Sequence, residues 1–296
     1  MPETLKRAVI VLGPTGVGKS EFALKLAQLF DGEIISADSV QVYKGLDIGS
    51  AKITESEMQG VRHHCIDFLE PEADFSVFEF VEKTKACIED ICARGKLPII
   101  CGGTGLYVKA LVEGFDFGGS GREPEFREKL WQMDVSALHE MLEKLDPEKA
   151  AQISVNDKKK TIRAIEIAEF GDKPTKKGSD INFLALAITQ DRDKLYQRIN
   201  KRVDIMLEKG LVGEVEALKN RGLNESYQSM KAIGYKETLA YLNGEIDYDK
   251  MVELIKQHSR NYAKRQMTYL RGMGIKMFDR ESEDDIIKFV RDWYEN

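Results

Sequence analysis

The chain has 296 residues, of which 42% are hydrophobic, and its 50 acidic and 44 basic residues give a formal charge of −6. This length suits one large α/β domain or a domain with an insertion, and it is ample for a buried core. The negative charge argues against a protein coated in basic surface. No apolar run reaches the roughly 18 residues of a membrane-spanning helix. The first seven residues contain no secretory apolar region, so we expect a cytoplasmic protein that makes no membrane contact.

The four cysteines are Cys65, Cys87, Cys92 and Cys101, and they lack C-x-x-C spacing. Neither a zinc site nor a disulfide framework is indicated, and we interpret them as reduced core thiols. The adjacent His63 and His64 have no partners at metal-ligand spacing, so we interpret them as structural polar contacts.

A phosphate-binding loop follows the first predicted strand, over residues 8–12. Its residues fit G-x-x-x-x-G-K-[ST] and are followed by a helical pattern over 21–30. They are Gly13, Pro14, Thr15, Gly16, Val17, Gly18, Lys19 and Ser20. Glycines let successive N–H groups face one concavity, the helix N-terminus adds positive potential, and the lysine adds a mobile charge. The loop therefore predicts a di- or triphosphate site of the kind found in nucleotide-binding proteins.

Strands and helices then alternate, which is typical of a parallel, doubly wound sheet. We predict strands over 33–37, 64–68, 97–101, 183–189 and 275–278. We predict helices over 76–94, 191–209, 213–220, 230–242, 248–272 and 283–294, and shorter amphipathic helices over 126–131, 135–145 and 157–170. The fold class is therefore α/β, a P-loop NTPase-like parallel sheet flanked by helices. Glycine-rich junctions divide it into a core, 1–115 and 181–296, and an inserted all-helical subdomain, 116–180.

Unusual residues follow two of the predicted strands. Asp38 follows the strand over 33–37, and Gly102-Gly103-Thr104-Gly105 follows the strand over 97–101. In parallel sheets these positions face the crevice that holds the phosphate loop. A motor ATPase usually ends such a strand with an acidic magnesium partner, so ordinary ATP hydrolysis is disfavoured. Asp38 is either a turn-forming residue or a base that faces an acceptor.

Two basic runs stand out in this acidic chain. Residues 158–177 carry seven basic and three acidic residues, and residues 256–271 carry five basic residues and no acidic one. One such run is usually a solvated helix face, but two favour a polyanionic partner.

With these pieces assembled, the chain closely resembles the tRNA isopentenyltransferase family, the tRNA dimethylallyltransferases. The resemblance covers roughly residues 8 to 275. It rests on Gly13 to Ser20, Asp38 to Gly49 with Ala51-Lys52, His63-His64, Gly102 to Tyr107, Asn156-Asp157, Arg163 to Glu166, Gly234 to Glu237 and Tyr262 to Thr268. It implies transfer of a dimethylallyl group from dimethylallyl diphosphate to N6 of adenosine 37 in tRNA, with release of diphosphate and with Mg²⁺ as cofactor.

The chemistry of such a transfer assigns roles to the residues at the crevice. Breaking the prenyl C–O bond puts charge on diphosphate, which loop N–H groups, Lys19 and a magnesium ion on Ser20 would stabilise. Asp38 would accept a proton from the adenine amine, and Thr104 would hold the leaving oxygen or orient the amine. Arg202 is either a second diphosphate cation or a surface helix charge.

The resemblance also implies tRNA contacts, and we expect the chain to act as a monomer on the anticodon stem-loop. By resemblance these contacts are Asp38, Ser39, Val40, Gln41, Thr104, Arg127, Lys159, Lys160, Thr161, Ile162 and Arg163. Lys264 and Arg265, in the second basic run, would bind phosphates of the stem-loop. The Gln41 amide would pair with a base edge or stabilise a turn.

Two positions depart from the family pattern. Lys160 stands where the family often has arginine, which keeps the charge but loses bidentate geometry. Tyr269-Leu270-Arg271-Gly272 replaces the common Trp-Phe-Arg-Arg run, which puts a stacking contact in doubt.

Three alternatives share parts of this pattern. A P-loop small-molecule or nucleotide kinase would also use the loop and Asp38. A prenyltransferase acting on free adenylate would share the chemistry, although the two basic runs favour RNA. A nucleotide-gated RNA-binding module without catalysis gives no reason for Asp38 and Thr104 beside the loop.

Overall fold

The chain is described by a computed structural model that covers residues 6–116, 124–170, 175–176 and 178–296. It divides into two compact units. Unit 1 comprises Met1–Ala110 and Asp180–Asn296, and unit 2 comprises Leu111–Ser179. Within the described residues, no helix is both long enough and apolar enough to cross a membrane.

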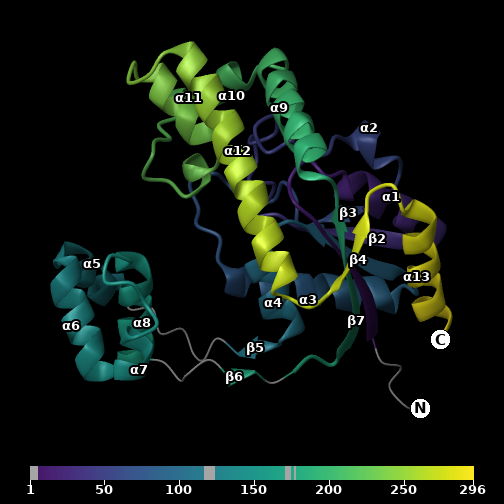
Figure 1. Ribbon diagram of the computed structural model, residues 1–296, viewed down its shortest axis with the longest axis horizontal. Coiled ribbons are helices and arrows are strands. Elements are labelled where there is room, and N and C mark those ends of the chain that lie inside the picture. Colours follow the sequence, from purple (N-terminus) through teal and green to yellow (C-terminus); the bar gives the residue numbers. More distant parts are fainter. Residues whose placement is uncertain (1–5, 117–123, 171–174, 177) are drawn as a thin grey trace. The chain divides into compact units, whose positions relative to one another are not determined.

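Unit 1 is built on a six-stranded sheet in the order β3-β2-β4-β1-β7-β8 (Figure 1). All neighbouring strands are parallel, which confirms the predicted sheet. The strands are β1 Lys6–Leu12, β2 Gly32–Ala37, β3 His63–His64, β4 Leu97–Gly102, β7 Ile181–Thr189 and β8 Lys276–Asp279. Every residue of β2 and β4 is buried, as expected for parallel strands covered on both faces.

Helices surround this sheet. They are α1 Lys19–Leu29, α2 Glu55–Met58, α3 Val77–Ala93, α4 Gly105–Val112, α9 Arg192–Glu208, α10 Leu211–Asn220, α11 Tyr235–Leu242, α12 Tyr248–Arg271 and α13 Glu283–Glu295, with the 3₁₀ helix η1 at Ser229–Lys231. Figure 1 shows α9 to α12 gathered in one group, from which the long α12 runs to the sheet. Side chains of α1 and α13 pack with β1, β4 and β7 in one hydrophobic core.

Two predicted elements of unit 1 are wrong in extent. The strand predicted over 64–68 is limited to β3, because Cys65 (φ 57°) and Asp67 (φ 54°) adopt left-handed conformations. The chain after β3 bonds instead to the loop after β2, where the N–H of Asp67 donates to the carbonyl of Gln41. The helix predicted over 230–242 begins only at Tyr235, because Ala232 is extended and Gly234 has φ 96°.

Unit 2 is largely helical. It contains α5 Pro124–Gln132, α6 Val135–Leu145, α7 Pro147–Ala150 and α8 Lys158–Phe170, together with an antiparallel pair of short strands, β5 Phe115–Asp116 and β6 Thr175–Lys176. Its core is formed by side chains of α5, α6 and α8, including Leu130, Leu138, Leu142, Ile162 and Ile165. The three helices predicted in this region are confirmed, each to within a few residues.

Candidate active site

The phosphate loop lies between the carboxyl end of β1 and the start of α1. Gly16 (φ 81°) and Gly18 (φ 96°) adopt the left-handed conformation that favours glycine. A side chain at Gly13 would place its Cβ 2.8 Å from the carbonyl oxygen of Ile188. No side chain in the described chain caps the start of α1 at Gly18. The first N–H groups of α1 therefore remain available to an anion.

Two arginines hold the outer carbonyls of this loop. Arg198 Nε donates to the Gly16 carbonyl oxygen (2.9 Å), and Arg280 Nη1 donates to that of Val17 (2.6 Å). The Arg280 guanidinium also occupies the space that a Cβ at Gly18 would need. Because the carbonyls are engaged, the loop is held in shape from outside, which leaves its N–H side for a ligand.

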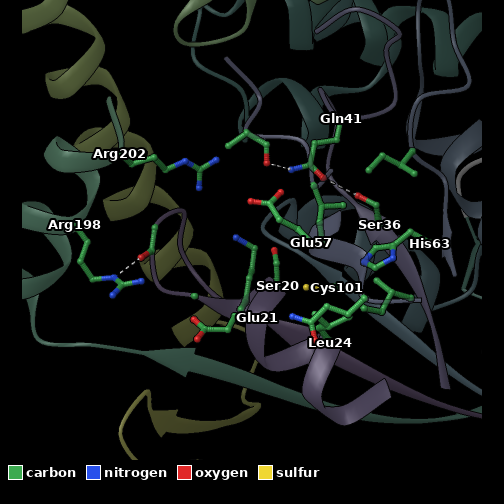
Figure 2. A pocket seen from close by; sticks show the side chains of 18 of the residues that line it. Ser20, Glu21, Leu24, Ser36, Gln41, Glu57, His63, Cys101, Arg198 and Arg202 are labelled. Carbon is green, nitrogen blue, oxygen red and sulfur yellow. Dashed lines mark hydrogen bonds between the residues drawn. The ribbon is translucent and has the colours of Figure 1, made fainter. Parts of the chain in front are cut away.

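A cavity of about 610 Å³ opens on this loop. Figure 2 shows Arg198 and Arg202 on one side of it and Ser36, Gln41 and His63 on the other. Its cationic lining is Lys19, Arg198, Lys201 and Arg202, and its apolar lining includes Leu24, Ile34, Ile53, Ile66 and Ile205. This combination suits a phosphate group attached to a short hydrocarbon.

Two cations meet at the inner end of this cavity. Burial lowers the pKa of Lys19, and the charge of Arg202 lowers it further, while Cys101 and Asp38 oppose the shift. Burial also lowers the pKa of Arg202, whose guanidinium donates to Thr15 Oγ1 (3.4 Å) and to the Ser50 carbonyl (3.3 Å). An anion bound here would relieve the repulsion between the two cations.

A second cavity, of about 340 Å³, adjoins the first at Arg202, which lines both. Its lining includes Thr15, Asp38, Ser39, Val40, Tyr262 and Arg265. Lys19 and Ser20 of the phosphate loop thus line one cavity and Asp38 lines the other, and Arg202 lines both.

Asp38 forms a turn and keeps one oxygen available. Its Oδ1 accepts hydrogen bonds from the N–H groups of Val40 (2.8 Å) and Gln41 (3.2 Å). Among the described residues we find no donor to Oδ2. The turn role left open by the sequence is therefore present, and the same geometry fixes the carboxylate at the edge of the second cavity.

Thr104 lies beside the same carboxylate. Its N–H donates to the carbonyl of Ala37, at the end of β2 (3.4 Å). Burial raises the pKa of Tyr262, the Asp38 charge raises it further, and a hydrogen bond with Thr104 opposes the rise. Asp38, Thr104 and Tyr262 therefore form one polar cluster at the carboxyl ends of β2 and β4.

The segment after Asp38 is held by one carboxylate. Glu214, on α10, accepts from the N–H groups of Asp47 (2.9 Å), Ile48 (2.7 Å) and Gly49 (3.1 Å). It also accepts from the Tyr235 hydroxyl (2.7 Å), whose ring would lie 2.6 Å from a Cβ at Gly49. The end of the motif from Asp38 to Gly49 is thus fixed to the half-buried Glu214.

Comparison with known proteins assigns the family. Residues 41–273 match the family described as IPP transferase, and residues 6–71 match the one described as isopentenyl transferase. The chain belongs to the IPP transferase family. The phosphate loop and Asp38 lie within the 6–71 match, and Thr104, Arg202 and Gln266 lie within the 41–273 match.

Full-length relatives agree with this assignment. A tRNA dimethylallyltransferase of an Exiguobacterium species is 44% identical over 96% of each chain. One of Staphylococcus carnosus is 45% identical over 92% of this chain and 90% of that one. A solved tRNA isopentenylpyrophosphate transferase of Bacillus halodurans is 41% identical, covers 97% of this chain and 96% of that chain, and has a TM-score of 0.76. A eukaryotic dimethylallyltransferase solved while acting on tRNA is 28% identical, with a TM-score of 0.88 over 98% of this chain and 80% of that chain.

Most residues predicted for the IPP transferase site meet around the two cavities of unit 1. Those that line a cavity are Thr15, Gly16, Gly18, Lys19, Ser20, Asp38, Ser39, Val40, Arg202 and Arg265. Thr104 lines neither cavity, and its N–H bonds the carbonyl of Ala37, next to Asp38. Gln41 lines the first cavity, and its amide donates to the carbonyls of Ser50 and Ala51 (both 3.3 Å), so it ties down the loop after β2. Lys264 is exposed on α12.

The predicted tRNA contacts of unit 2 form their own cluster on α5 and α8. Arg127 Nη1 donates to both carboxylate oxygens of the buried Glu166 (3.0 and 2.9 Å), and Arg163 donates to the same group (3.3 Å). Lys159 and Lys160 are exposed. Thr161 and Ile162 are buried within unit 2, and the Thr161 hydroxyl donates to the Asp157 carbonyl (2.9 Å), so neither side chain is exposed to a tRNA.

Sequence reasoning assigned no role to several residues that shape the site. Arg198, Arg280 and Gln266 contact the phosphate loop from distant elements. Only Gln266 carried a signal, because it belongs to the run Tyr262 to Thr268 on which the family resemblance rests. The departure at Tyr269 leaves an aromatic ring against Gly105, where a Cβ would lie 2.2 Å from the ring.

Proposed function

We propose that this chain transfers the dimethylallyl group of dimethylallyl diphosphate to N6 of adenosine 37 in tRNA and releases diphosphate. The observation that carries the proposal is the meeting of two cavities at Arg202, with the phosphate loop in one and Asp38 at the edge of the other. The two substrates would enter from different sides and react where the cavities join.

In this reaction the bond between prenyl C1 and the diphosphate oxygen breaks as a bond from C1 to N6 forms. Charge moves to the diphosphate, which the N–H groups at the start of α1, Lys19 and Arg202 would stabilise. The adenine amine becomes cationic as it attacks and passes a proton to Asp38 Oδ2. Thr104, in the same polar cluster, would orient the amine or the leaving oxygen.

The donors in the first cavity fit a magnesium ion. Ser20 Oγ lies at the start of α1 in this cavity, and the carboxylate of Glu57 lines it too. Mg²⁺ commonly takes one or two protein oxygens and completes its shell with phosphate oxygens and water. When bound, the ion would neutralise charge on the diphosphate. No cluster of three His, Cys, Asp or Glu side chains suited to a metal occurs in the described residues.

The tRNA would contact both units. In unit 1 the second cavity, lined by Ser39, Val40 and Arg265, would admit the adenine after it leaves its stack. Gln41 and the exposed Lys264 would make further contacts with the RNA. In unit 2 the exposed Lys159 and Lys160, with Arg163 and Arg127, would bind backbone phosphates of the anticodon stem-loop. We further propose that the protein acts as a monomer in the cytoplasm.

A transfer assay with two donors tests the proposal. The protein is incubated with unmodified tRNA, Mg²⁺ and labelled dimethylallyl diphosphate, and separately with γ-labelled ATP. The account predicts prenyl label on adenosine 37 and no phosphoryl transfer. Transfer of the γ-phosphate would instead support the kinase alternative, which the relatives do not favour.

A further inference from the structure

One side chain links the two halves of the proposed site. Gln266, on α12, is only 7% exposed. Its Oε1 accepts from the N–H of Thr15 in the phosphate loop (2.8 Å), and its Nε2 donates to the carbonyl of Gly103 (3.0 Å). Both polar ends of the amide are therefore used, each on a different loop.

The residues around Gln266 leave space for its side-chain amide and pack closely against it. A Cβ at Gly103 would lie 2.2 Å from Gln266 Nε2, so only glycine leaves the room that the bond needs. On the same helix, Ala263 is completely buried, and the Tyr262 hydroxyl lies near Gln266 and Thr104, both of which lower its pKa against the effect of burial. The α12 helix thus presents one rigid face to the phosphate loop and to the turn that carries Thr104.

The bond to Thr15 has a consequence for the ligand. Because the Thr15 N–H is engaged by Gln266, it is not among the N–H groups that can meet a diphosphate in this conformation. Its hydroxyl accepts from Arg202 (3.4 Å), and Thr15 lines the second cavity. Gln266 therefore holds the loop at the position where the two cavities join.

We propose that Gln266 is a positioning residue that fixes the distance between the leaving-group loop and Thr104. This inference rests on the proposed transferase function. Loss of the amide would let the loop and the turn move independently, so each substrate would still bind but the reacting atoms would be misaligned. A misplacement of about 1 Å can cost about 100-fold in rate.

The test compares Gln266→Met with Gln228→Met. Gln228 makes a matching pair of bonds and lines neither cavity, since it accepts from the Phe75 N–H (3.2 Å) and donates to the Phe75 carbonyl (2.9 Å). Methionine keeps the length of the side chain and removes both bonds in each protein. For both variants one measures Tm, kcat, both KM values, and the Kd values for inorganic diphosphate and for tRNA.

We expect Gln266→Met to lower kcat by about 100-fold while both Kd values stay within about threefold of wild type. Gln228→Met should lower Tm to a similar extent and leave kcat within about threefold. A third variant, Gln266→Glu, keeps the acceptor for Thr15 but sets a carboxylate against the Gly103 carbonyl, so its kcat should fall as well.

The inference is overturned if Gln266→Met or Gln266→Glu turns over at the wild-type rate, or if both methionine variants lose kcat in proportion to Tm. Failure of the proposed function would show separately, because the wild-type protein would then transfer no prenyl group at all.

Discussion

At the scale of single residues, the two carboxylate oxygens of Asp38 have different roles: Oδ1 holds a turn, and Oδ2 is the proposed proton acceptor. Asp38→Asn keeps an Oδ1 that can accept from Val40 and Gln41, so the turn should survive. The amide cannot take the proton of the adenine amine, so we expect kcat to fall by about 100-fold or more. The Kd for tRNA, measured by filter binding, should change less than about threefold.

Asp47→Asn is the matched control for this variant. Asp47 is exposed and pairs with Lys52 (2.6 Å). The substitution therefore removes a nearby carboxylate that does not line the second cavity. Equal loss of turnover in both variants, or none in Asp38→Asn, would remove Asp38 from the proton transfer.

Single residues also show which parts of the candidate site could be predicted from the sequence. The phosphate loop was predictable because its conformation follows from adjacent glycines and from one strand and one helix on either side. The residues that brace it were not, because Gln266, Arg198 and Arg280 lie 251, 182 and 263 positions away from the loop residues they contact. Contacts of that range depend on the tertiary fold.

At the scale of elements, one carboxylate joins β2, β3 and α3. Glu33 is buried and bonds Arg94 and His64 (2.7 Å). The hydrogen bond from Arg94 lowers its pKa from 4.5 to about 2, with His64 adding to the effect. Because the folded pKa is depressed, this stabilisation is present above pH 4.5 and is lost as the pH falls towards 2.

Glu33→Gln should therefore lower the free energy of unfolding by about 3 kcal/mol at pH 7. The loss relative to wild type should shrink as the pH falls below 4.5, measured by urea unfolding between pH 7 and pH 3. Glu89→Gln, which breaks the exposed pair with Lys6 (2.9 Å), should cost less than about 1 kcal/mol. A deficit of Glu33→Gln that is independent of pH would show that the ion pair is not its source.

The two mispredicted elements have physical causes of the same kind. Residues 64–68 have the composition of a strand, but two left-handed residues turn the chain onto the loop after β2. Residues 230–242 have a helical hydrophobic pattern, yet the helix starts only after Gly234. The N–H of Gly234 donates to Glu237 Oε2 (2.7 Å) and so caps the start of the helix. In both cases a tertiary contact or cap overrides local propensity.

At the scale of the whole molecule, we propose that a diphosphate leaves into the phosphate loop of unit 1 while Asp38, across Arg202, takes a proton from an RNA amine. The sheet places both groups at the carboxyl ends of β1 and β2, and Gln266 on α12 ties the loop after β1 to Gly103 after β4.

The most direct measurement is a crystal structure with an unmodified tRNA anticodon stem-loop and an unreactive thio analogue of dimethylallyl diphosphate. The account predicts the diphosphate on Lys19 and the N–H groups at the start of α1, and N6 of adenosine 37 about 3 Å from Asp38 Oδ2. A diphosphate bound elsewhere, or an Asp38 carboxylate turned away from the extruded adenine, would contradict it.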